Sequence, residues 1–92
     1  MSGAASPTTP SSNLGPRSEA MLRAAGIASL DDLRSLGSVA AYARVKATGA
    51  NASLNLLWAL EGALSGLPWQ VVAREHRTSL LLALDEHARR HA

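Results

Sequence analysis

Hydrophobic residues recur along this chain at the three- and four-residue spacings of amphipathic helices. Leu30, Leu33 and Leu36 stand at every third position, which predicts a helix over residues 30–36. Similar spacings predict helices over residues 16–25 and 39–48. The first half of the chain is therefore expected to be helical from residue 16 onward.

Two further helices are predicted in the second half. Residues 54–65 are apolar on nearly every side, and such a helix belongs in the middle of a bundle, with Trp58 and Leu60 buried. Residues 74–90 carry leucines on one face and end in basic residues, which favour the negative end of a helix dipole. These patterns predict an all-α fold, a compact bundle of five short helices without strands.

The predicted helix ends carry local signals. Pro16 suits the first position of a helix, where its missing N–H would have no partner, and Gly26 suits the left-handed residue after a helix. Ser29 is expected to cap the helix over residues 30–36, with Asp32 reaching back toward the cap. Ser38 and Ser53 are expected to cap the helices over 39–48 and 54–65.

Composition sets the domain organisation. Alanine and leucine supply 33 residues, whereas valine and isoleucine supply five, a bias that favours helix over strand. Residues 1–12 are rich in serine, threonine and proline and predict a flexible tail, so residues 13–92 form the foldable domain. A bundle this small and apolar is also compatible with a homodimer, in which apolar surface of each copy would be buried.

Charge and cysteine content narrow the class of protein. The net charge is +2 and cysteine is absent, which excludes disulfides and thiolate metal sites. No apolar run is long enough to span a membrane, and the first residues lack the features of a secretory signal. We therefore expect a cytoplasmic protein with no membrane association and no cofactor.

Few residues suggest catalytic or metal chemistry. His87 and His91 have the spacing of two helical metal ligands, but a third ligand is missing, so we expect no metal site. Glu61 lies within the apolar helix and should meet an arginine or backbone donors. No nucleophile elbow or phosphate loop is present, so we expect no catalytic residues and no enzyme activity. Tyr42, Trp58 and Trp69 are expected in the core, which argues against single-strand binding by base stacking.

Several segments together resemble one known family. They are "NLGPRSEAMLRAAGI", "LDDLRSLGSVAAYARVK", "SLNLLWALEGAL" and "LPW", spread over residues 13–84. In this order they are similar to the C-terminal domain of the TfoX/Sxy family, regulators of natural DNA competence in bacteria. Full-length members carry an additional N-terminal domain, so we expect a stand-alone copy of the C-terminal domain. The resemblance implies a non-enzymatic module that acts through a protein partner in competence or transcriptional regulation.

A second resemblance lies within the first. The stretch "NLGPRSEAMLRAAGIASLDDL" is similar to the loop and second helix of a helix-hairpin-helix motif, in which backbone N–H groups contact a DNA phosphate. The residues that would take this role are Gly15, Arg17, Ser18 and Arg23. Asn13 stands where the motif has its first glycine. The alternative function is therefore weak, sequence-independent DNA binding.

A wider basic surface is a related hypothesis. It would require that the predicted helices present one common face. Its members would be Arg17, Arg23, Lys46, Arg74 and Arg77. Scattered arginines on a helical bundle more often form an ordinary solvated surface. The sequence does not decide between this interpretation and a basic binding surface.

Overall fold

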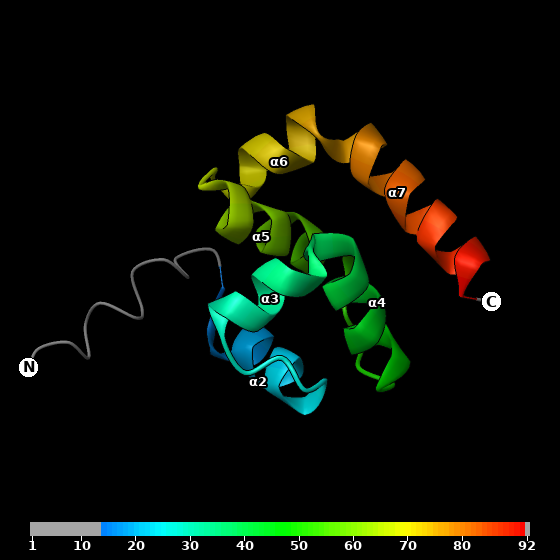
Figure 1. Ribbon diagram of the computed structural model, residues 1–92. Helices are drawn as coiled ribbons and strands as arrows, with labels where there is room; N and C mark the ends of the chain where they lie inside the picture. The colour runs from blue at the N-terminus through cyan, green and yellow to red at the C-terminus, as the bar shows by residue number, and fades with distance from the viewer. Residues whose placement is uncertain (1–13, 92) are drawn as a thin grey trace, which may run out of the picture.

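The computed structural model describes residues 14–91, and the predicted tail over residues 1–12 lies outside this part. Within it the chain forms helices and no strand (Figure 1). The helices are α2 (Pro16–Ala24), α3 (Leu30–Leu36), α4 (Ser38–Ala47), α5 (Leu54–Ser65), α6 (Trp69–Glu75) and α7 (Arg77–Arg90). The all-α prediction is confirmed, but the described residues hold six helices where five were predicted.

The start of α2 and the turn into α3 follow the local signals. Pro16 is the first residue of α2, and Gly26 has a φ of +84° in the turn that follows the helix. Ser29 Oγ accepts a hydrogen bond from the N–H of Asp32 at 3.1 Å. The carboxylate of Asp32 accepts from the N–H of Ala28 at 3.1 Å, one residue before the cap. These four contacts and positions confirm the predicted helix end and the predicted cap.

The junction between α3 and α4 differs from the prediction at Ser38. The residue that precedes α4 is Gly37, with φ +85° and ψ 161°, a combination that is essentially restricted to glycine. Ser38 is the first residue of the helix and makes no side-chain cap. Ser38 is 5% exposed, and its hydroxyl donates to a residue of another helix, so the predicted cap at Ser38 is wrong.

Helix α5 has the predicted bounds and supplies the centre of the core. Leu57 and Leu60 are fully buried, and Trp58 is 3% exposed, which confirms the placement of this helix. It packs against α4 on one side and α6 on the other. Ser53 stands at the N-cap position as predicted, although its side chain makes no capping hydrogen bond.

The C-terminal part is two helices where one was predicted. Pro68 precedes α6, and the chain leaves helical geometry at His76 before α7 begins. In Figure 1 the two helices form an arm that follows the upper and right edges of the molecule, with α6 beside α5 and α7 beside α4. The helix predicted over residues 74–90 therefore begins three residues too early and misses α6.

Helix α7 is the least buried of the longer helices. Leu80 is its only buried residue, and Leu82 is 66% exposed. The remaining core comes from the other helices and from residues between or before them, Leu14, Ala25, Ile27 and Ala52. No helix within residues 14–91 has the length and apolar character needed to cross a membrane.

Candidate functional site

The turn at the start of α2 holds three of the predicted nucleic-acid-binding residues. Gly15 is exposed in an extended conformation with φ −88°, and its carbonyl accepts the N–H of Glu19 at 3.0 Å. Arg17 and Ser18 lie in the first turn, where backbone N–H groups have no partner within the helix. A Cβ at Gly15 would meet nothing within 4 Å, so the turn does not require glycine there.

Arg23 lies at the other end of the same helix. It belongs to the last turn of α2, about 9 Å along the axis from Arg17 at 1.5 Å per residue. At 100° per residue the two side chains also leave the helix about 120° apart. The structure therefore groups Gly15, Arg17 and Ser18 and places Arg23 away from them.

A hollow of about 400 Å³ lies beside this turn, and we name it the α2/α5/α6 hollow. Its polar and aromatic lining comes from α2, from the loop before α5, from α5 itself and from α6. These residues are Arg17, Ser18, Asn51, Ser53, Asn55 and Trp69. Trp69 was expected in the core, but it is 38% exposed, so that prediction is wrong.

Sequence reasoning missed the polar residues that line this hollow together with Arg17. Asn51 and Ser53 precede α5, and Asn55 is its second residue. Asn55 is a polar interruption of that helix, and this was the one signal in the sequence. Their proximity to Trp69 depends on how α5 and α6 pack, which local patterns do not specify.

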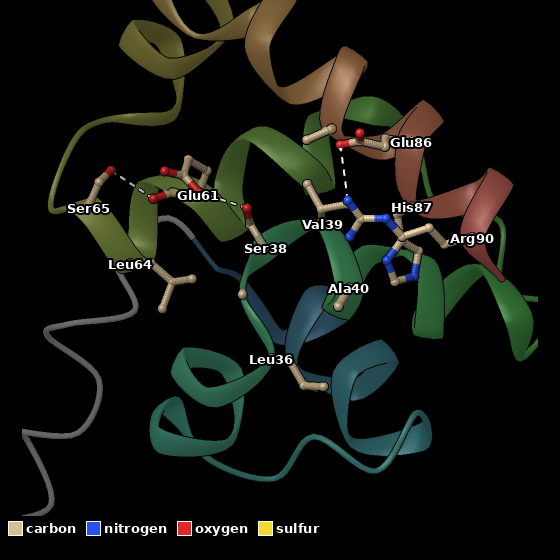
Figure 2. Close-up of a pocket in the computed structure, with 12 residues that line it drawn as sticks. Leu36, Ser38, Val39, Ala40, Glu61, Leu64, Ser65, Glu86, His87 and Arg90 are labelled. Atoms are coloured by element: carbon tan, nitrogen blue, oxygen red, sulfur yellow. Dashed lines mark hydrogen bonds and ion pairs between the residues drawn. The ribbon is translucent and has the colours of Figure 1, made fainter.

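A second hollow of about 540 Å³ lies between the α3–α4 junction, the end of α5 and the second half of α7 (Figure 2), and we name it the α4/α5/α7 groove. Its apolar residues include Leu36, Val39 and Leu64, all half-buried. Charged residues of α7 stand at its edge. Glu86 and Arg90 are joined there by an ion pair at 3.6 Å.

Glu61 lies at one wall of this groove. Its carboxylate accepts a hydrogen bond from Ser38 Oγ at 2.7 Å (Figure 2). Because Ser38 begins α4, the carboxylate stands close to the positive end of that helix, a favourable position for an anion. The prediction of an arginine or backbone partner is wrong, and the bond instead joins α4 to α5 through two residues that are 23 positions apart in sequence.

The basic residues proposed as a wider patch have separate roles. Lys46 Nζ donates to the carbonyl of Ala52 at 3.3 Å. The Arg77 guanidinium lies 6.0 Å from the centre of the Trp58 ring, at the limit of a cation–π contact. Arg74 lies 3.7 Å from Glu75. In these contacts the three cations meet groups of the bundle or a neighbouring carboxylate. Of the five residues of the hypothetical patch, Arg17 is the one that lines the α2/α5/α6 hollow or the α4/α5/α7 groove.

The histidines and paired carboxylates show helix-surface contacts. The rings of His87 and His91 lie 4.2 Å apart between centres. Asp31 pairs with Arg34 at 3.1 Å, and Asp85 pairs with Arg89 one turn away. Within residues 14–91 no three histidine, aspartate or glutamate side chains are grouped as a metal site would require.

Tyr42 holds the loop between α4 and α5. Its hydroxyl donates to the carbonyl of Ala52 at 3.1 Å, and the side chain is 5% exposed. Burial raises the pKa of this hydroxyl above its ordinary value, because the charged form loses its hydration. The residue therefore acts as a core anchor, as the sequence predicted.

The fold and these surfaces define a class of protein before any family is considered. Residues 14–91 form a small all-helical domain with open surface hollows, among them the α2/α5/α6 hollow and the α4/α5/α7 groove. The chain belongs to the family of the TfoX C-terminal domain, whose family model matches residues 10–84. This family, associated with competence and DNA transformation, is of a regulatory type and is not a known enzyme family. Neither the curated proteins nor the solved structures yield a match to this chain.

Proposed function

We propose that this chain is a non-enzymatic regulatory module that acts through a protein partner in competence or transcriptional regulation, in the cytoplasm of a bacterium. The observation that carries the proposal is the family match over residues 10–84, which covers most of the folded part. The α4/α5/α7 groove supports a protein partner. It combines half-buried apolar side chains with charged ones at its edge, the usual composition of a protein interface.

The test is a gene deletion with complementation in the bacterium that carries the gene. Transformation frequency and transcript levels are measured in the deletion strain, and both should fall and return with the wild-type gene. Unchanged transformation together with unchanged transcripts would contradict the proposal.

A matched pair of variants tests the groove in the same strains. Ala83 and Ala88 are both exposed on α7, but only Ala83 lines the groove. Ala83→Arg should fill the groove and fail to restore the phenotype, whereas Ala88→Arg should restore it. Immunoblots check that the two variants are present at comparable abundance. Equal rescue by the two variants would show that the partner does not use the groove.

The second candidate function is sequence-independent binding of duplex DNA by a helix-hairpin-helix-like turn at Gly15. The exposure of Gly15 and Arg17 in the first turn of α2 favours it. Binding of a labelled duplex should fall as salt rises, and Arg17→Ala should reduce the slope of log affinity against log salt by about 0.9. Absence of duplex binding at low salt would exclude this function.

A further inference from the structure

The α2/α5/α6 hollow differs in charge from the α4/α5/α7 groove. Arg17 is the only ionisable side chain among the described residues that line the hollow, and no carboxylate accompanies it. The groove, by contrast, is lined by Glu61 and Glu86 together with Arg90. Of the two depressions, the hollow therefore favours an anionic ligand.

The amide and aromatic side chains that line the hollow are suited to recognise two features of a ligand. Asn51 and Asn55 carry side-chain amides, each with donor and acceptor atoms that match the edge of a nucleobase. Trp69 is 38% exposed as a residue and lines the hollow, and an aromatic ring at a surface is a stacking partner for a base. A cation, amides and an aromatic ring at one place match a phosphate, a base edge and a base face.

The size of the hollow suits a small ligand group. About 400 Å³ lies near the lower end of the range of roughly 300–1,000 Å³ that is typical of small-molecule sites. Met21, Leu56 and Ala59 add an apolar part to the lining, which suits a flat ring better than a free inorganic ion. One nucleotide fits this description.

We propose that the α2/α5/α6 hollow binds one nucleotide unit of a single-stranded nucleic acid. Its phosphate lies at Arg17, its base stacks on Trp69, and the amides of Asn51 and Asn55 contact the base edge. This binding does not depend on the protein-partner role. It also differs from duplex binding at the Gly15 turn, which needs no aromatic residue.

The first experiment titrates a short labelled oligothymidylate at low salt and follows its fluorescence anisotropy. Trp69→Leu should weaken binding about tenfold, within the range measured for one stacked base. Arg17→Gln should weaken it and lower the salt slope by about 0.7, the value for one phosphate of a single strand. Arg23→Gln is the matched control, because it removes the same charge from the same helix outside the hollow.

Intrinsic fluorescence gives a second readout that needs no substitution. Trp58 is 3% exposed and Trp69 is 38% exposed, so quenching by an added strand reports a base on Trp69. The proposal is overturned if the oligothymidylate does not bind, if it binds without quenching, or if Arg23→Gln weakens binding as much as Arg17→Gln. Circular dichroism of each variant separates loss of folding from loss of binding.

Competition experiments distinguish a nucleic-acid strand from a free nucleotide and from inorganic phosphate as the ligand of the hollow. Thymidine monophosphate should displace the strand at higher concentration than unlabelled oligothymidylate, and inorganic phosphate should displace it less well than either. Equal displacement by inorganic phosphate would show that the base is not recognised and would overturn the proposal. Tighter binding of a duplex would also overturn it and would favour the second candidate function. The deletion phenotype is unaffected by these results, so the two proposals fail independently.

Discussion

Truncation of Leu60 to alanine should cost this domain a large part of its stability. Leu60 is fully buried in α5, the helix that packs against both α4 and α6. The substitution removes three carbon atoms, which contribute about 2.4 kcal/mol at about 0.8 kcal/mol each. The cavity that remains raises the expected loss to about 3–4 kcal/mol, within the range of about 2–5 measured for buried leucines.

This loss is large compared with the total free energy of unfolding of the domain. A domain of this size is expected to have a free energy of unfolding of roughly 5–14 kcal/mol. A loss of about 3 kcal/mol should lower the melting temperature by about 12–24 °C. Circular dichroism during heating and urea titration measures both quantities, because helices make up most of the described residues.

Leu82→Ala provides the matched control. Leu82 lies on α7 with 66% of its surface exposed, and leucine and alanine have similar helix propensities. Its truncation should change the free energy of unfolding by less than about 0.5 kcal/mol. A loss below about 1 kcal/mol at Leu60, or equal losses at the two positions, would refute the placement of α5 at the centre of the core.

Three further predictions concern local features, each checked by the free energy of unfolding. Gly37→Ala should cost about 1–3 kcal/mol, because φ is +85° with ψ 161°, whereas Gly15→Ala at φ −88° should be nearly neutral. Ser29→Ala should cost about 1 kcal/mol, and Ser53→Ala should cost less, because only Ser29 makes a side-chain cap. The raised pKa of Tyr42 means that the unfolded state releases the phenolic proton first, so stability should fall as pH rises above about 10, and more steeply than in Tyr42→Phe. Equal costs within either pair, or parallel pH curves, would contradict the corresponding reasoning.

The sequence by itself determined the helical class and most helix ends in the first two thirds of the chain. The bounds of α3 and α5 were predicted residue by residue, and Pro16, Gly26 and Ser29 act as expected. These signals succeed because a cap or a left-handed glycine acts on residues within one turn of itself. The burial of Trp58 and Leu60 was also predictable, since a helix that is apolar on all sides has to lie in the interior.

The last third of the chain needed tertiary structure. The break at His76 divides one apparent helix into two, so that α6 can pack on α5 while α7 packs on α4. No glycine or proline marks the break. The segment Trp69–Glu75 is short, and its position after Pro68 reads equally well as a helix start or as an interruption.

The candidate sites were decided by tertiary structure alone. Glu61 meets Ser38 across 23 residues of sequence, and Trp69 lines the same hollow as Arg17. Such pairs depend on how whole helices pack, and the pattern of one helix contains no information about the residue that faces it. The sequence therefore predicted which side chains are unusual, Glu61 and Arg17 among them, and the fold determined what each one meets.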